Sequence, residues 1–381
     1  MKAKTVARVI GSIARTLLGL VFIFSGFVKA VDPLGTTYKI EDYLTAFGSF
    51  FTTFIPAAEV FAWLLIAFEF LLGISLLFNI RTQVCSWLAL LMMCFMTPLT
   101  LYIALTNPVS DCGCFGDALV LSNWATFWKN IVLLALVIIL LLTKRYIPQT
   151  FIGLAEGCIF GFFVLVLLFI MLWGRLRLPM IDFRPYKVGN NIIELMEIPE
   201  DAEPDEYNTT FIYEKDGVEQ EFTLDNYPKN DSTWTFVDQK SVLVKKGYEP
   251  PIHDFEVMTL DYEDITDDIL YSEDPVTLVI MYDLKKTSRH QLGKVTALFS
   301  ECLSREQPFY IITGSSTDDI ESFCEEICKD ETSNELTPFN HPEAVFCTCD
   351  GVALKTIVRA NPGVIVIQNG VVIDKYNLRN K

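Results

Sequence analysis

The stretch DCGCFGDALVLSNWATFWKNIVLL, residues 111–134, joins a Cys-Gly-Cys loop to the start of a long apolar run. The run continues to residue 143, and about 20 apolar residues are enough to cross a hydrocarbon core of about 30 Å. The stretch therefore predicts a dithiol at the surface of a bilayer, directly beside a membrane-spanning helix.

Other parts of the N-terminal half have the same apolar character. Five spans are predicted, at 9–28, 55–78, 84–106, 125–143 and 151–174. The first is not expected to be a cleaved signal peptide, because it lacks a small-residue cleavage site and further spans follow it. The short connections predict antiparallel neighbours, and the lipid bilayer is the first expected partner.

The distribution of basic residues predicts the orientation of these spans. Six of them fall on one side if the N-terminus is cytoplasmic: Lys2, Lys4, Arg8, Arg81, Lys144 and Arg145. Arg175 and Arg177 argue weakly for the opposite orientation. With five spans, the Cys-Gly-Cys loop and the C-terminal half then lie outside the cytoplasm. For a bacterial chain this means the inner membrane and the periplasm, where disulfides persist.

Charge separates the two halves of the chain. Residues 1–180 carry 12 Lys and Arg against 8 Asp and Glu, whereas residues 181–381 carry 18 against 39. The back half is therefore a strongly acidic, water-soluble body. Because such a surface repels nucleic acid, nucleic-acid binding is excluded.

Ionisable side chains inside the spans are candidate functional groups, since burying a charge in a membrane is costly. Glu59 and Glu69 lie in the second span, and Arg15 and Lys29 flank the core of the first. Antiparallel packing predicts the pairs Lys29–Glu59 and Arg15–Glu69. The alternative is that Glu69 handles protons or serves a quinone site.

The Cys-Gly-Cys sequence restricts the chemistry of the loop. Cys112 and Cys114 can approach each other only in a tight turn, which Gly113 tolerates. A disulfide closed in this way would be strained, and strained disulfides are the labile or catalytic ones. Asp111 and Asp117 flank the pair and should disfavour a thiolate. No metal site is predicted, because two thiolates make only half a zinc site and the chain has three histidines. The alternative is a structural turn with incidental cysteines.

Three segments together resemble the DoxX/MauE group of four-helix membrane proteins. They are RTLLGLVFIFSGFVKAVDP at 15–33, PAAEVFAWLLIAFEFLLGISLLF at 56–78, and the opening stretch at 111–134. The loop is especially similar to that of the methylamine-utilisation MauE proteins, and this resemblance carries Cys112, Cys114, Phe115 and Gly116 over as motif residues. It implies a four-helix bundle over 1–150, with 151–178 added as a fifth span. It also implies oxidative maturation, in which the bundle acts with a thioredoxin-like partner.

Beyond Pro179 the sequence changes to short strands. Residues 209–224 predict a hairpin with Asp-Gly at its turn, and residues 233–248 predict a second strand pair. Residues 179–249 are therefore expected to form a β-rich extracytoplasmic segment.

From Asp274 the pattern predicts strand, helix, strand, helix, strand, helix and a final hairpin. Residues 250–381 resemble the thioredoxin fold of the TlpA/ResA branch, which implies a cis peptide bond before Pro362. The family places Cys-x-x-Cys after the first central strand, where this chain reads DLKKTSRHQL, residues 283–292. The resemblance therefore implies a thioredoxin-like domain without its usual nucleophile.

Further cysteines lie in this domain. Cys347 and Cys349 form a second Cys-x-Cys at a strand end and are secondary redox candidates. If the strand is regular, one thiol is expected to be buried and the other exposed. Cys324 and Cys328 are expected on one apolar helix face, and Cys302 in the core.

The expected fold is thus an α-helical membrane bundle, a four-helix DoxX/MauE-like core plus a fifth span, followed by a β-rich segment and an α/β thioredoxin-like domain. The leading hypothesis is a membrane thiol–disulfide oxidoreductase that acts through Cys112 and Cys114 on a periplasmic client or redox partner. The alternative is a non-enzymatic scaffold whose degenerate thioredoxin-like domain binds a partner protein. No cofactor is evident; a quinone is possible, but nothing in the sequence supports one.

Overall fold

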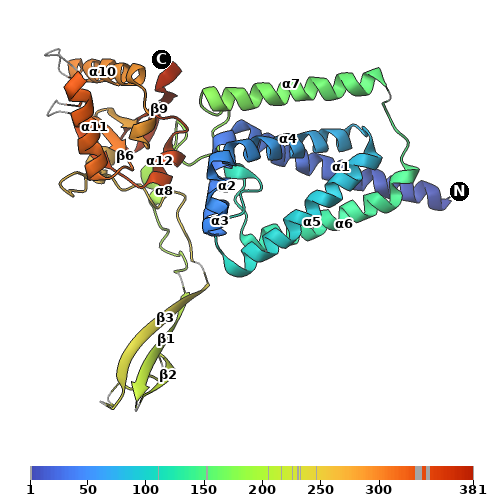
Figure 1. The fold of residues 1–381 in the computed structure, drawn as a ribbon, viewed down its shortest axis with the longest axis horizontal. Coiled ribbons are helices and arrows are strands. Elements are labelled where there is room, and N and C mark those ends of the chain that lie inside the picture. Colours follow the sequence, from blue (N-terminus) through green and yellow to red (C-terminus); the bar gives the residue numbers. More distant parts are fainter. Residues whose placement is uncertain are drawn as a thin grey trace.

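A computed structural model describes most of the chain. The described residues are 2–109, 111–151, 153–204, 206–215, 217–224, 226–229, 231, 233–245, 247–330, 337–339 and 344–380. A helical bundle, a small sheet and an α/β unit follow one another along the chain (Figure 1).

The bundle is built from five long helices. They are α1 (Lys2–Val31), α4 (Ala58–Leu77), α5 (Thr82–Thr106), α6 (Asn123–Thr143) and α7 (Leu154–Leu176). Within the described residues, five helices, two of them with short 3-10 extensions, are long and apolar enough to cross a membrane, which confirms the five predicted spans. Ser122 marks the start of α6 with its side chain, which accepts a hydrogen bond from the backbone N–H of Ala125.

Small residues fix the register between α1 and α4. A Cβ atom on Gly19 would come within 2.9 Å of the Leu77 backbone, and one on Gly26 within 2.7 Å of the Phe70 backbone. A Cβ on Gly73 would meet the Ile23 backbone at 2.6 Å in the same way. The two helices therefore approach backbone to backbone, as membrane helices with small interface residues do.

One end of the bundle carries a cap of short helices. Asp32 ends α1 and caps α2 (Pro33–Ala46) by accepting a hydrogen bond from the Gly35 N–H. The chain then passes through α3 (Ser49–Thr52) and η1 (Ile55–Ala57) into α4. In Figure 1, α2 and α3 lie at the end of the bundle that faces the α/β unit, while the N-terminus lies at the far end.

A three-stranded antiparallel sheet projects away from both larger bodies (Figure 1). Its order is β2 (Val218–Thr223), β1 (Glu206–Lys215), β3 (Thr235–Lys245). The β1–β2 hairpin is the predicted one. The second predicted strand pair is wrong, because residues 235–245 form one long strand that pairs along β1.

The α/β unit contains a six-stranded mixed sheet. Its order is β4 (Met258–Thr259), β7 (Ala344–Thr348), β6 (Phe309–Thr313), β5 (Val276–Ile280), β8 (Gly363–Gln368), β9 (Val371–Asn377). The helices are α8 (Ile192–Met196), α9 (Thr266–Leu270), α10 (Arg289–Ser304), α11 (Thr317–Asp330) and α12 (Gly351–Ile357). Single turns of 3-10 helix complete the chain: η2 (Gly116–Ala118), η3 (Lys144–Tyr146), η4 (Leu284–Lys286) and η5 (Leu378–Asn380). The order of elements from β5 to β9 is the predicted one.

The strand directions fit this connectivity. β5, β6 and β7 are parallel, and β8 and β9 run antiparallel as a closing hairpin. The Asn361–Pro362 peptide bond that leads into β8 is cis. All five residues of β5 are buried, as expected of a central strand covered on both faces.

Residues on both sides of the small sheet complete one core. Tyr186 and Ile192 precede the small sheet, Ile252 and Phe255 follow it, and all four pack in the same buried cluster. An isolated bridge pairs Asn191 with Val371 of β9. Within the segment 179–249, the sheet strands thus occupy 206–245, and the preceding residues pack against the α/β unit.

Candidate functional site

The Cys-Gly-Cys loop connects α5 to α6 at the capped end of the bundle. Gly113 has φ +63° and Gly116 has φ +51°, both in the left-handed region that favours glycine. The Gly116 N–H donates to the Gly113 carbonyl at 3.1 Å, and the Gly113 N–H donates to Asp111 at 2.7 Å. The chain therefore turns sharply at the residue between the cysteines.

This turn brings the two sulfur atoms together. Cys112 Sγ and Cys114 Sγ are 3.1 Å apart as free thiols, and both side chains are buried. A disulfide bond is about 2.05 Å long, so a small rearrangement of this turn would join the sulfurs.

The surroundings of the two thiols give them different pKa values. The Cys112 thiol donates a hydrogen bond to Cys114, which lowers the pKa of Cys114 to about 6 despite its burial. The positive charges of Lys129 and Lys29 also lower the pKa of Cys114. Donating that hydrogen bond, together with burial, raises the pKa of Cys112. Cys114 is therefore the thiolate of the pair near neutral pH.

The flanking acids Asp111 and Asp117 each have a positively charged partner, which the sequence did not predict. Asp111 forms an ion pair with Lys39 at 2.9 Å, and Asp117 lies 3.4 Å from Arg359. Each carboxylate thus has a cation beside it, which offsets its charge. The prediction that these acids disfavour a thiolate is wrong for Cys114, whose pKa is lowered, and distant parts of the chain supply the cations beside the acids.

Helices α1 and α2 bind the backbone of the loop through side-chain hydrogen bonds. The Ser25 hydroxyl lies 2.7 Å from the carbonyl oxygen of Cys114, and the Tyr43 hydroxyl donates to the carbonyl oxygen of Cys112 at 2.7 Å. The backbone of both cysteines is therefore anchored to the bundle.

A buried ion pair contacts Ser25, the α1 residue that binds the loop. Lys29 Nζ is 2.6 Å from Glu69 Oε2, and it also donates to Ser25 at 2.9 Å. Both charged side chains are almost fully buried, at 5% and 2% exposure. The ion pair is therefore connected through Ser25 to the Cys114 backbone.

The predicted pairs Lys29–Glu59 and Arg15–Glu69 are wrong. Glu59 instead contacts Arg175 of α7 at 2.5 Å, and Arg15 donates to the Leu77 carbonyl at 2.9 Å. The cause is the register set by the glycine contacts, which places Lys29 beside Glu69 and Arg15 beside the end of α4. Counting residues from the expected helix ends could not reveal this close approach.

Phe115 and Gly116 complete the loop motif. The Phe115 ring is buried, lies 5.3 Å from the Phe24 ring, and has Lys129 Nζ 4.4 Å from its centroid. Phe115 therefore fastens the loop to α1 and α6 and keeps a positive charge close to Cys114.

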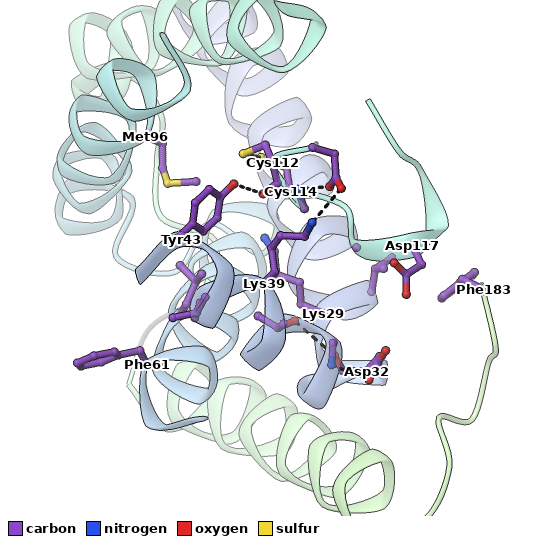
Figure 2. Close-up of a pocket in the computed structure, with 18 of the residues that line it drawn as sticks. Lys29, Asp32, Lys39, Tyr43, Phe61, Met96, Cys112, Cys114, Asp117 and Phe183 are labelled. Atoms are coloured by element: carbon purple, nitrogen blue, oxygen red, sulfur yellow. Dashed lines mark hydrogen bonds and ion pairs between the residues drawn. The ribbon is translucent and has the colours of Figure 1, made fainter. Parts of the chain in front are cut away.

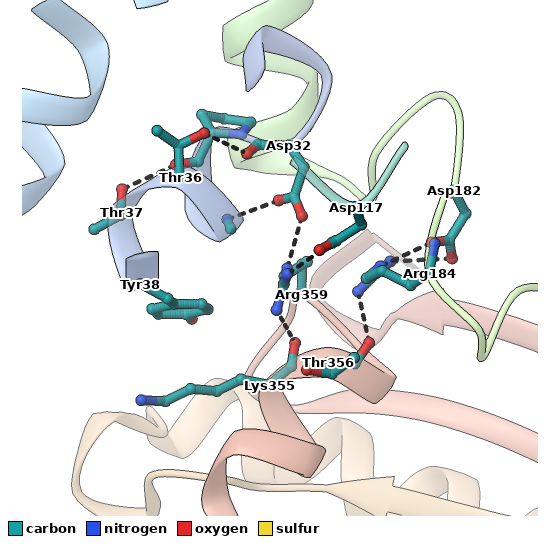
Figure 3. A network of polar contacts seen from close by, with 12 residues as sticks. Asp32, Thr36, Thr37, Tyr38, Asp117, Asp182, Arg184, Lys355, Thr356 and Arg359 are labelled. Atoms are coloured by element: carbon teal, nitrogen blue, oxygen red, sulfur yellow. Dashed lines mark hydrogen bonds and ion pairs between the residues drawn. The ribbon is translucent and has the colours of Figure 1, made fainter. Parts of the chain in front are cut away.

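An arginine from the α/β unit clamps the loop to the bundle (Figure 3). Arg359 Nε is 2.8 Å from Asp32, and its Nη2 reaches Asp117 of the loop. Burial alone would raise the pKa of Asp32, but the charges of Arg359 and Arg184 outweigh burial and lower it. Asp32 therefore stays ionised and keeps this ion pair.

Other contacts hold the same interface. Tyr38 of α2 donates to Tyr282 at 3.2 Å, Lys355 lies over the Tyr38 ring, and Arg184 donates to the Thr356 carbonyl at 3.1 Å. Pro362 lies three residues after Arg359. The segment before β8 therefore faces the membrane bundle.

A cavity of about 630 Å³ opens beside the cysteines. Figure 2 shows Tyr43, Met96, Cys112 and Cys114 on its walls, with Lys29 and Lys39 nearby. Apolar side chains of α4 and α5 form much of its remaining lining, and α1, α2, the loop and residues 179–184 contribute the rest. The dithiol is thus part of the wall of a site large enough for a small ligand.

The second Cys-x-Cys lies elsewhere. Cys347 and Cys349 are both buried in the core of the α/β unit, and burial raises the pKa of each to about 12. The expectation of one buried and one exposed thiol is wrong, because Cys347 faces the core from β7 and Cys349, one residue beyond the strand, packs in the same buried cluster. Cys302 is buried, as expected, and Cys324 packs against the second core cluster. The side chain of Cys328 lies outside the described residues.

Several site residues were missed by sequence reasoning. They are Ser25, Lys39, Tyr43, Lys129, Arg184 and Arg359. Ser25 and Lys129 stand within or beside quoted motifs, and their polarity inside a span was an available signal. Arg359 had no such signal, since its partners lie more than 240 residues away.

The loop and the helices around it can now be compared with known proteins. Residues 7–143 match the family model of the methylamine utilisation protein MauE. The five apolar helices and this match describe a MauE-like, multi-pass membrane protein. A domain of unknown function, DUF8463, matches residues 207–246, which cover the three-stranded sheet. No curated protein and no solved structure matches the chain.

Proposed function

We propose that this MauE-like protein is a membrane thiol–disulfide oxidoreductase that uses Cys112 and Cys114 to oxidise a client protein outside the cytoplasm. The observation that carries the proposal is the pair of sulfurs 3.1 Å apart in the wall of an open cavity. The lowered pKa of Cys114 supports it, because the thiolate is the reactive and the better leaving form.

The chemistry is a two-electron exchange. In the oxidised protein a client thiolate attacks Cys112 of the Cys112–Cys114 disulfide, and Cys114 leaves as the thiolate with the lower pKa. A second client thiolate then attacks the mixed disulfide and releases Cys112. The client gains a disulfide, and the protein is left with two thiols.

The α/β unit is proposed to be a thioredoxin-like cap without independent activity. Three parallel strands and a closing antiparallel hairpin support a thioredoxin-like arrangement. The start of α10, where such domains carry their nucleophile, holds Ser288 and Gln291 in a capping box instead of cysteine. The segment around Arg359 contacts the bundle, so we assign the domain to holding the loop rather than to exchange.

The proposed orientation places the loop and the cap in the periplasm. Arg81, Lys144 and Arg145 lie at the same end of the bundle as the N-terminus, because Lys144 contacts Ser86 and Gly11 contacts Thr143. The capped end is then the outer end under the rule that basic residues stay inside.

Redox trapping of the full-length protein tests this function. The protein in detergent is equilibrated with glutathione buffers of graded ratio, acid-quenched and alkylated, and peptides are weighed. We expect Cys112 and Cys114 to gain or lose two hydrogens together, whereas Cys347 and Cys349 stay reduced. The Cys112→Ala and Cys114→Ala variants should oxidise a reduced model protein no faster than background.

The matched control is Cys347→Ala, which removes a sulfur from the other Cys-x-Cys. It should lower thermal stability, because it truncates a buried core side chain, but it should leave client oxidation unchanged. Full activity of the Cys112→Ala variant would favour the scaffold function instead.

A further inference from the structure

The cavity beside the cysteines has two chemically different ends. Its lining near the loop is polar and contains Lys29, Lys39, Tyr43 and the two cysteines, and the polar lining also includes Asp32, Asp111, Asp117, Asp182 and Arg184. Its other end is apolar and is lined by side chains of α4 and α5: Phe61, Leu65, Phe68, Leu91, Phe95 and Leu99. Such a cavity suits an amphiphilic ligand with a polar head and an apolar chain.

The apolar end opens toward the surroundings of the bundle. Leu91 and Phe95 are 67% and 68% exposed, and both lie in the middle of α5. A second cavity of about 970 Å³ lies farther along α4 and α5, and it shares Leu65 and Phe68 with the first. The two cavities therefore adjoin at these side chains, and the exposed Leu91 and Phe95 open the first one between α4 and α5 to the hydrocarbon of a bilayer.

The dithiol at the polar end needs an electron acceptor. Re-forming the disulfide from the Cys112 thiol and the Cys114 thiolate breaks one S–H bond, makes one S–S bond and releases two electrons and one proton. An acceptor that reaches this site through the apolar opening must be lipid-soluble and must take two electrons together with protons. Quinones have this chemistry.

Lysine ammonium groups at the polar end supply hydrogen-bond donors of the kind that a quinone oxygen accepts. A lysine ammonium carries three donors, and in the described part of the chain Lys29 directs two of them to Glu69 and Ser25. Its side chain lines the cavity, so the third N–H is available to a ligand. Lys39 lies in the wall on the α2 side, where it also pairs with Asp111, whereas the Tyr43 hydroxyl already donates to the Cys112 carbonyl.

We propose that this cavity binds a lipid-soluble quinone, with its ring beside Cys112 and Cys114 and its chain between α4 and α5. The inference rests on the proposed function and names the electron acceptor. The Cys112 thiol and the Cys114 thiolate are oxidised to the disulfide, and the quinone takes both electrons, one proton from Cys112 and one proton from water to become the quinol.

The test uses full-length protein in nanodiscs of phosphatidylcholine without quinone. The protein is reduced with dithiothreitol, freed of reductant and mixed anaerobically with a decyl-tailed benzoquinone. Absorbance follows the quinone, and alkylation follows the cysteines. We expect one quinol per protein, formed together with the Cys112–Cys114 disulfide.

A tryptophan at Leu91 should obstruct the path into the cavity. We expect Leu91→Trp to raise the quinone concentration that gives half the maximal rate, with glutathione exchange at the cysteines unchanged. The matched control is Leu105→Trp, on the same helix, where the side chain is also exposed but lines neither cavity. It should behave as the unchanged protein does.

The outcomes separate this inference from the proposed function. If the pair exchanges with glutathione but reduces no quinone, the cavity holds bulk lipid and the quinone site is overturned, while the proposed function stands. If quinol forms equally well with Leu91→Trp, the proposed path is wrong. If the pair exchanges with neither partner, both proposals fail.

Discussion

The chain contains two Cys-x-Cys sequences, and they lie in opposite environments. Cys112 and Cys114 sit in a loop, with their sulfurs 3.1 Å apart in the wall of a cavity. Cys347 lies near the end of β7, and Cys349 directly follows that strand. Both thiols are buried in a hydrophobic core. The same spacing therefore produces a close pair in one place and two separate core side chains in the other.

Backbone conformation makes the difference. In an extended strand, residues i and i+2 are about 6.6 Å apart along the chain. The Cys347 and Cys349 sulfurs accordingly contact different carbonyls, those of Val345 and Asp254. Gly113, with φ +63°, turns the loop and removes this separation. A Cys-x-Cys sequence thus says little about redox chemistry until the conformation of its central residue is known.

The largest expected contrast is in thiol reactivity with pH. Cys114, with a pKa of about 6, gains its thiolate as pH rises through 6 and is mostly ionised at pH 7. Cys347 and Cys349, with pKa values of about 12, are ionised to only about one part in 10⁵ there. Alkylation of the full-length protein by iodoacetamide from pH 4 to 9 should show one early site, at Cys114.

A Cys112→Ala variant tests the cause of the low pKa of Cys114. Loss of the hydrogen bond from Cys112 should move the midpoint of Cys114 alkylation to higher pH, since that bond is the main cause of the lowered pKa. Lys129→Gln should move it in the same direction by less. An unchanged midpoint in both variants would contradict the proposed electrostatics.

The next effect concerns Arg359. This residue belongs to the α/β unit, which contains Cys347 and Cys349, but its side chain contacts the loop that carries Cys112 and Cys114. Arg359→Gln leaves Asp32, whose side chain is only 16% exposed, without this cation, and breaking a buried ion pair costs about 3–5 kcal/mol. We expect a lower melting temperature in detergent and slower glutathione exchange at Cys114. Adding Asp32→Asn should restore part of the stability, because it removes the uncompensated charge.

Lys286→Gln is the control for this clamp. Lys286 lies in the same unit and pairs with Asp283, but it is 77% exposed, so its loss should change stability by about 0–1 kcal/mol. Equal losses from Arg359→Gln and Lys286→Gln would show that the clamp does not hold the loop.

The smallest effect is expected from the turn itself. Gly113→Ala forces a side chain into the left-handed region at a cost of about 1–2 kcal/mol. Its Cβ would also meet the flexible side chain of Lys39 at 2.8 Å. We expect slower disulfide formation between Cys112 and Cys114, measured by glutathione exchange.

Gly217→Ala is the matched control, because Gly217 has φ +81° and open space around it, in the hairpin of the small sheet. It should carry a similar backbone strain without slowing exchange. If both variants slow exchange alike, the turn at Gly113 is not specific to the pair.

The sequence by itself determined the features that depend on local pattern. The five membrane spans follow from runs of apolar residues, and the order of strands and helices after Asp274 follows from short-range periodicity. The Cys-Gly-Cys loop and its place beside a span could be read in the same way. These predictions succeed because membrane spans and the order of strands and helices depend mainly on residues that are close together in the chain.

Tertiary structure alone decided which charges meet. The contacts of Gly19 and Gly26 with α4 place Lys29 beside Glu69, and they leave Glu59 to Arg175. Folding also brings Arg359 across more than 240 residues to Asp117, and so supplies the cation that the loop sequence lacks. Ion pairs depend on distances of a few ångströms in space, and those distances are set by backbone contacts between helices that no local pattern encodes.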